Sequence, residues 1–149
     1  MFKYKLLPSV YFYSLLIIFF ILHAIIPIIQ VVNAPHRYVG IGVIILGAII
    51  NLMGNQSFYR AGVLESSVEV QSELVTTGFY RFSRNPMYLG GIIILLGESI
   101  LLGSIITFAA PVLFFLAVSM IVIPKEEKDL ETKFGEEYLK YKKTVRRWV

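Results

Sequence analysis

The chain has 149 residues, of which 56% are hydrophobic and only 16% are charged, and its mean hydropathy is +0.71. This balance excludes a soluble globular protein and indicates one small integral membrane domain over residues 1–149. The chain has no cysteine and two separated histidines, so we expect no disulfide, no thiolate nucleophile and no metal site. The net charge of +4 comes from basic residues beside apolar runs, which indicates membrane topology rather than nucleic-acid binding.

Two apolar runs in the first part of the chain are each long enough for a membrane span, which needs ~20 residues. The first covers residues 10–32, exceeds the hydrophobic region of a signal peptide and lacks a small-residue cleavage site. We therefore expect a retained span, bent near its far end by Pro27. The second covers residues 38–58, and its small residues should let another helix approach closely. These residues are Gly40, Gly42, Gly47 and Gly54.

The third apolar stretch, residues 87–123, is too long to cross ~30 Å of hydrocarbon once at ~1.5 Å per residue. It predicts a tight helical hairpin that turns near Gly103 and Ser104. The sequence thus predicts an all-α integral membrane protein with four transmembrane helices, the last two forming the hairpin.

Polar side chains inside the predicted spans are few. Glu98 is a charge within a span, which is rare and often functional. It is either protonated or bonded to a polar neighbour, which we favour, or it recognises an amine or hydroxyl headgroup. We interpret His23, Asn51 and Asn55 as helix–helix contacts rather than as catalytic groups.

The basic residues are distributed unevenly around these spans. With four spans, the Lys and Arg residues at both chain ends and in the polar segment 59–84 lie on one side, and only Arg37 lies on the other. By the positive-inside rule, this predicts a multi-pass membrane protein whose termini and polar segment face the cytoplasm.

From Pro124 the chain becomes charged, and we predict a cytoplasmic amphipathic helix that Pro124 opens. Acidic residues follow at its start, where the helix dipole favours them. Gly135 predicts a bend or a close packing contact within this helix. One face is defined by residues at steps of three and four, namely Ile123, Glu127, Leu130, Phe134, Tyr138, Tyr141 and Val145.

The block at residues 74–88 is polar and interrupted by Gly and Pro, although apolar runs surround it. Charge and irregular backbone persist at a bilayer edge only where protein or a water-filled cavity satisfies them, so chemistry is expected here. Pro86 suits the first turn of the third span and biases Asn85 to an extended backbone, which aims Asn85 over the helix end. The chain has no phosphate-binding loop, nucleophile elbow or His-based triad. Acids, tyrosines and backbone suit a chemistry whose reactivity a cofactor brings.

Two motifs carry a resemblance to a known family. The first is Leu74-Val75-x-x-Gly78-x-Tyr80-x-x-x-Arg84-Asn85-Pro86-x-Tyr88-x-Gly90, and the second is Glu126-Glu127-x-x-Leu130-x-x-x-Phe134-Gly135-x-x-Tyr138-x-x-Tyr141-x-x-x-Val145. Together they resemble the membrane methyltransferases related to isoprenylcysteine carboxyl methyltransferase and to the phospholipid N-methyltransferases. The resemblance implies that S-adenosylmethionine lies in a cytoplasmic pocket closed by the C-terminal helix, and that lipophilic substrates enter from the bilayer.

Carried over by motif position, the resemblance implies a catalytic group of Arg84, Glu126 and Glu127, in which Arg84 orders the loop by binding carboxylates of the charged helix. Residues 146–148 are interpreted first as an interfacial anchor and second as part of a lid over the cofactor. The implied cofactor contacts are Ser72, Glu73, Leu74, Val75, Tyr80, Asn85, Pro86, Met87, Tyr88 and Glu126.

The sequence departs from the isoprenylcysteine pattern at two positions. Asn85 replaces the usual His. Val122 lies one turn before Glu126, where the carboxyl methyltransferases carry an arginine that engages the substrate carboxylate. A carboxylate acceptor would lose that counter-charge here. We therefore expect an S-adenosylmethionine-dependent methyltransferase whose lipophilic, membrane-soluble acceptor is not a carboxylate.

Two other functions remain open. A sterol-reductase-like NADPH enzyme would share a similar C-terminal architecture, but the chain is short and offers no basic cluster dedicated to a 2′-phosphate. A non-catalytic membrane protein that keeps the fold is the third interpretation.

Overall fold

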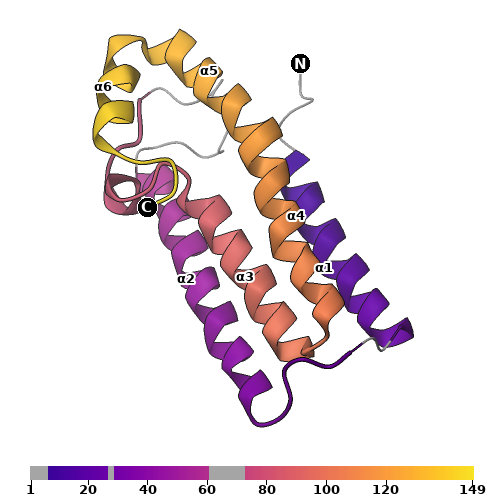
Figure 1. Cartoon of the computed structure of the whole chain (residues 1–149). Coiled ribbons are helices and arrows are strands. Elements are labelled where there is room, and N and C mark those ends of the chain that lie inside the picture. The colour runs from indigo at the N-terminus through magenta and orange to yellow at the C-terminus, as the bar shows by residue number, and fades with distance from the viewer. Residues whose placement is uncertain (1–6, 27–28, 61–72) are drawn as a thin grey trace.

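The computed structural model describes residues 7–26, 29–60 and 73–149, and Figure 1 shows their arrangement. Within these ranges all extended elements are helices, and the only β-type pairing is an isolated bridge between Gln30 and Ser104. Four helices form a bundle, and two more extend from one end of it. The bundle contains α1 (Leu7–Ile25), α2 (Val39–Arg60), α3 (Pro86–Leu102) and α4 (Ala109–Ala117), and the extension contains α5 (Ile123–Phe134) and α6 (Glu136–Thr144).

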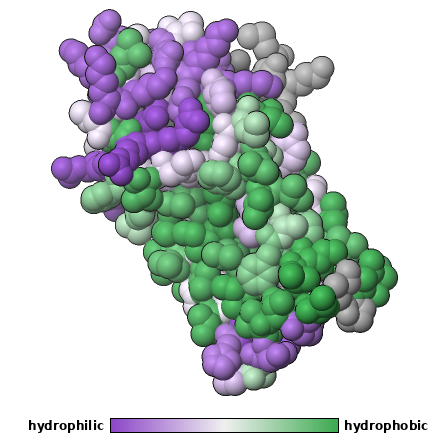
Figure 2. Space-filling model, in the orientation of Figure 1, coloured by the Kyte–Doolittle hydropathy of each residue, from purple (hydrophilic) through white to green (hydrophobic). Residues whose placement is uncertain are grey.

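The apolar helices give the molecule a hydrophobic belt between two polar ends, as Figure 2 shows. Three helical segments, 8–25, 36–57 and 105–134, are long and apolar enough to cross a membrane, and α3 is a shorter apolar helix. The fold is therefore all-α over the described residues, with three to four helices that could span a membrane.

The first span ends earlier than the sequence predicts. Helix α1 stops at Ile25, whereas the apolar run continues to residue 32, and the predicted bend at Pro27 lies outside the described residues. The N–H groups of Val31 and Val32 instead donate to the carbonyl of Gly103, at 2.8 and 3.2 Å. These apolar residues are not helical because the turn after α3 satisfies their backbone.

The hairpin turn near Gly103 is where the sequence predicts it. Gly103 ends α3 with φ of +75°, a left-handed conformation that a residue with a Cβ adopts only at a cost. Behind the turn, Ser99, Ser104 and Thr107 are buried, and the Ser99 hydroxyl donates to the Thr107 carbonyl at 2.7 Å. The turn therefore carries its own hydrogen bonds within an apolar environment.

Helices α2 and α3 meet along a seam of glycines. A Cβ built on Gly47 would lie 2.8 Å from the carbonyl oxygen of Gly90, and one on Gly40 would lie 2.5 Å from that of Gly97. Gly40 and Gly47 thus let the two backbones touch, as predicted, and a Cβ on Gly54 would lie 2.9 Å from the Met87 side chain. Gly42 differs, because nothing lies within 4 Å of its Cβ position.

Helix α5 continues the last bundle helix without a break. A 3₁₀ turn (Ile105–Phe108), α4, a π-helical turn (Val118–Val122) and α5 follow one another directly. Pro124 does lie in the first turn of α5, but the helix that contains Glu126 has no free N-terminus. The helix-dipole explanation for the acids is therefore wrong, and their partners must account for them. A π turn widens the helix, which suits a proline that cannot donate a backbone hydrogen bond.

The predicted single C-terminal helix is divided in two at Gly135. Gly135 has φ of +52°, and α6 begins at the next residue. Figure 1 shows α6 running back from the far end of α5 toward the bundle. This reversal brings Tyr138 and Tyr141 inward, where both are buried. It also returns the end of the chain to the start of α3.

Candidate active site

The two sequence motifs meet at the polar end of the bundle. The first motif contributes a 3₁₀ turn, η2 (Gly78–Arg81), and the loop that leads into α3. The second contributes α5 and α6. The Tyr141 hydroxyl donates to the Tyr80 carbonyl at 2.7 Å, which fixes α6 against η2. Burial raises the pKa of the Tyr141 hydroxyl, so it remains a neutral donor.

Glu127 lies at the centre of a network that joins the loop, α6 and the end of the chain. Arg84 Nη1 donates to Glu127 Oε1 at 3.0 Å and to the Tyr138 hydroxyl at 3.1 Å. Arg147 binds both Glu127 oxygens, through Nε at 3.0 Å and Nη2 at 2.9 Å. The side chains of Arg84 and Glu127 are each only 10% exposed. The hydrogen bonds to Glu127 raise the pKa of Arg147, and Lys142 Nζ lies 3.7 Å from Glu127 Oε2, so three cations face one carboxylate.

Glu126, the neighbouring acid, has quite different surroundings. The Tyr88 hydroxyl donates to Glu126 Oε1 at 2.6 Å. None of the ion pairs found between described residues includes Glu126. Burial first, and then the charges of Tyr141 and Glu126, raise the pKa of the Tyr80 hydroxyl, so this phenol remains protonated. The oxygens of a partly buried carboxylate and of two protonated phenols can accept hydrogen bonds here. The site therefore suits a ligand with a cationic or hydroxyl donor.

The last residues of the chain form a strap across the loop before α3. Arg84 N donates to the Arg146 carbonyl at 3.0 Å, and Asn85 Nδ2 donates to the Arg147 carbonyl at 3.0 Å. The Ser83 hydroxyl reaches the same Arg147 carbonyl at 3.4 Å. The Asn85 amide, which the sequence predicts to point over the helix end, is thus bound to the strap. The loop and the strap hold one another in place.

The remaining predicted cofactor contacts are less closely connected. Pro86 is buried at the start of α3, and the Met87 carbonyl accepts a hydrogen bond from Asn51 Nδ2 of α2 at 2.9 Å. Val75 is buried, whereas Leu74 is half-buried and Glu73 is exposed. Ser72 lies outside the described residues. The structure therefore brings Tyr80, Tyr88 and Glu126 together.

Sequence reasoning gives Arg147 only a secondary place in this site. Its neighbours in the sequence favour a membrane anchor, but Arg147 forms the bidentate pair with Glu127. No local pattern marks this contact, because it depends on the chain reversal at Gly135. Trp148, in contrast, packs on Phe115 of α4 with ring centroids 5.2 Å apart, which is compatible with an interfacial position.

Two further positions lie apart from the site. Glu98 is about 15 Å along α3 from Tyr88, at ~1.5 Å per residue, and is half-buried. Val122 is 6% exposed and belongs to the hydrophobic core, with Leu95 and Ile123. Among the described residues, no three His, Asp or Glu side chains are grouped so that they could hold a metal ion.

Comparisons with known proteins agree on one family. Residues 35–137 match the model of the phospholipid methyltransferase family. A probable protein-S-isoprenylcysteine O-methyltransferase of Oryza sativa subsp. indica is 32% identical over 72% of this chain and 58% of its own length. Protein-S-isoprenylcysteine O-methyltransferase A of Arabidopsis thaliana is 34% identical over 71% of this chain and 55% of its own length. An uncharacterized protein of Haemophilus influenzae is 41% identical over 42% of this chain and all of its own length.

Proposed function

Because this chain belongs to the phospholipid methyltransferase family, we propose that it is an S-adenosylmethionine-dependent methyltransferase acting on a lipophilic acceptor dissolved in the membrane. The names of the plant relatives refer to O-methylation of an isoprenylcysteine, which supports methyl transfer to a lipophilic acceptor. The chain spans little more than half the length of those relatives, so the acceptor is argued from its own residues.

One observation carries this proposal, namely that both motifs converge on one small region at the end of α3. Tyr88 binds Glu126 at 2.6 Å, and Arg84 binds Glu127 at 3.0 Å, across 38 and 43 residues of chain. We assign Glu126, with Tyr80 and Tyr88, to the polar part of the cofactor, its ammonium group or ribose hydroxyls. Arg84 and Glu127 keep the loop closed against α5.

The chemistry that this arrangement serves is a simple displacement. Adenosylmethionine would supply an electrophilic methyl group on a sulfonium, which an O, N or S lone pair of the acceptor displaces in line. The side chains of the site then bind, orient and exclude water, and form no covalent bond. The Glu127 network would help to bind and orient the cofactor. It fixes the loop from two sides, so the side chains that contact the cofactor are already in position before it binds.

The acceptor follows from Val122. Its side chain is buried in the hydrophobic core one turn before Glu126, so this position offers no charge to a substrate carboxylate. We propose an acceptor without a carboxylate at the reacting centre, such as an amine-bearing phospholipid headgroup or a lipophilic thiol or alcohol. This differs from the isoprenylcysteine substrate that the plant names suggest.

The polar end of the molecule, with α5, α6 and the site, is proposed to face the cytoplasm in a four-span protein. The excess of Lys and Arg at this end supports that orientation.

The experiment incubates the purified, reconstituted protein with labelled adenosylmethionine and offers three acceptors in turn: a prenylcysteine acid, phosphatidylethanolamine and a lipophilic thiol. Transfer to either of the last two, with little to the first, supports the proposal. Strong transfer to the prenylcysteine acid would refute the assignment of Val122.

The melting temperature provides a separate test, since a shift caused by NADPH and not by adenosylmethionine would favour the reductase interpretation.

A further inference from the structure

Three cations and one aromatic side chain form an exposed collar where the polar end meets the apolar belt. The collar consists of Arg81 and Phe82 at the end of η2, Lys143 near the end of α6, and Arg146 in the strap. All four are exposed, and the Phe82 side chain is 68% exposed. No ion pair between described residues includes any of the three cations.

Hydrogen bonds within the site bring the segments that carry these four residues close to one another. The bond from Tyr141 to the Tyr80 carbonyl places Arg81 beside the end of α6, and the bond from Arg84 to the Arg146 carbonyl places the strap beside the loop. Arg84 lies only two residues before α3, one of the apolar helices. The collar therefore lies near the start of α3, at the polar end of the apolar belt that Figure 2 shows.

The charge of α6 changes from negative at its start to positive at its end. The helix begins with two exposed acids, Glu136 and Glu137, and ends with the exposed Lys143. Because α6 runs back toward the bundle, its acidic end lies far from the apolar belt and its basic end lies close to it (Figure 1). This distribution complements the helix dipole, and it also places positive charge at the end of α6 that lies nearer the apolar belt.

We propose that the collar binds the headgroups of anionic phospholipids in the adjacent leaflet. Phosphate oxygens attract Lys and Arg side chains near a membrane surface, and each such residue favours association with anionic lipid by about fivefold. Phe82 enters the interface beside them, and Trp148, on Phe115, does so from the strap. The exposed, apolar Phe82 side chain beside the cations favours a lipid surface, which has both charged headgroups and hydrocarbon, over a nucleic acid.

The test uses Trp148 as a reporter, because it is the one tryptophan of the chain. The full-length protein is reconstituted into bilayers with equal amounts of phosphatidylcholine and phosphatidylglycerol, in which only one of the two lipids carries brominated acyl chains. Bromine quenches tryptophan at short range, so the ratio of the two quenching efficiencies reports which lipid surrounds the strap. We expect brominated phosphatidylglycerol to quench more strongly, and high salt to reduce the difference.

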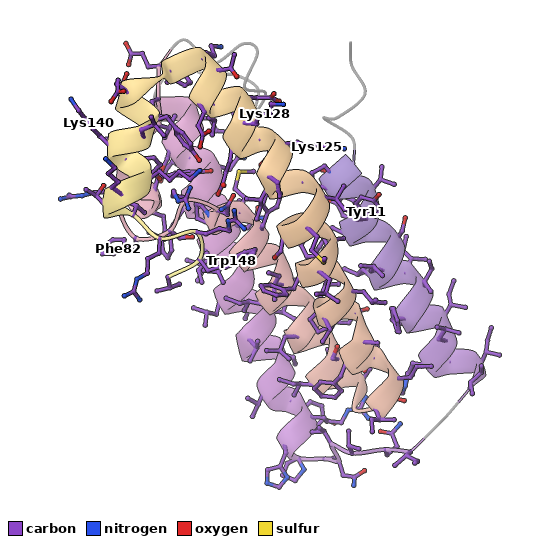
Figure 3. The ribbon with its side chains drawn as sticks, turned by 45° about the horizontal axis from the view of Figure 1, so that its top comes forward. Tyr11, Phe82, Lys125, Lys128, Lys140 and Trp148 are labelled. Atoms are coloured by element: carbon purple, nitrogen blue, oxygen red, sulfur yellow. The ribbon has the colours of Figure 1, made fainter. Side chains whose placement is uncertain are left out.

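The double variant Arg81→Gln/Lys143→Gln should bring the quenching ratio close to one. The matched control Lys128→Gln/Lys133→Gln removes the same charge from α5, where Lys128 lies well away from Phe82 (Figure 3), and should keep the wild-type ratio. Equal quenching by both lipids in the wild type would overturn the proposal, as would an equal loss in the control. If the double variant does not fold, the salt dependence of the wild-type ratio decides the question.

Discussion

Arg147 binds both oxygens of Glu127, at 3.0 and 2.9 Å, although 20 residues and a chain reversal separate them. Arg84 approaches the same carboxylate from the loop before α3. Glu127 is therefore the point at which the loop, α5 and the strap are joined. This relationship ties the shape of the candidate site to the last residues of the chain.

Removing the shared carboxylate should destabilise the protein more than removing either arginine. Glu127→Ala leaves the Arg84 guanidinium, which is 10% exposed, without its counter-charge, and such changes cost about 3–5 kcal/mol of unfolding free energy. Arg147 is 38% exposed, so water screens its pair, and Arg147→Ala should cost only about 1 kcal/mol or less. Thermal unfolding in detergent measures both.

The control for this comparison is Glu137→Ala, which removes an exposed acid from the first turn of α6. Its melting temperature should stay close to that of the wild type. A wild-type melting temperature for Glu127→Ala would mean that the network does not hold the loop.

The glycine seam gives a prediction with an internal control. A Cβ on Gly90 would lie 2.7 Å from both Asn51 N and the Gly47 carbonyl oxygen, so α2 and α3 must separate in Gly90→Ala. Overpacking of this kind costs about 1–3 kcal/mol. Gly42→Ala, on the same helix pair, meets nothing within 4 Å and should be neutral or slightly stabilising. Equal melting temperatures for the two variants would contradict the close packing of the seam.

The sequence predicts this seam because small residues in a membrane span let another helix approach closely, and residues 38–58 are rich in glycine. That reasoning does not separate Gly42, which meets no neighbour, from Gly40, Gly47 and Gly54. The run from residue 29 to residue 32 shows the limit of the same reasoning. Hydropathy reports that a segment is apolar, but it does not report that the Gly103 turn satisfies its backbone.

The site shows a similar division. The family resemblance implies that Arg84 binds a carboxylate of the charged helix, and the structure places it on Glu127. The paths of α6 and the strap are not predictable in this way, because they depend on one positive φ angle at Gly135. A short-range pattern contains no information on where the chain goes after such a reversal, so it does not reveal the contacts of Arg147 and of Asn85 with their partners.

The cofactor assignment predicts that Tyr88→Phe weakens the binding of adenosylmethionine. The change removes the hydroxyl that donates to Glu126 at 2.6 Å and leaves a partly buried carboxylate without this donor. Loss of such a partner costs roughly 1–3 kcal/mol, which corresponds to a loss of affinity of order tenfold. Isothermal titration calorimetry measures it. Tyr13→Phe, on an exposed position of α1, is the control and should bind like the wild type. Unchanged affinity in Tyr88→Phe would remove Tyr88 and Glu126 from the cofactor site.

The proposed topology can be tested by labelling, since the chain has no cysteine of its own. Single cysteines at Lys128 and Lys140, both exposed on the polar end, should react with a membrane-impermeant maleimide only when the cytoplasmic face is open to it. His36, before α2, and Ile105, after the Gly103 turn, are exposed at the opposite end and should react from the other side. Ile105 is the decisive position, because it lies between α3 and α4 and reports whether these two helices form a membrane-crossing hairpin. Labelling of Ile105 from the same side as Lys140 would exclude four spans, and labelling of His36 from that side would exclude the orientation inferred from the basic residues.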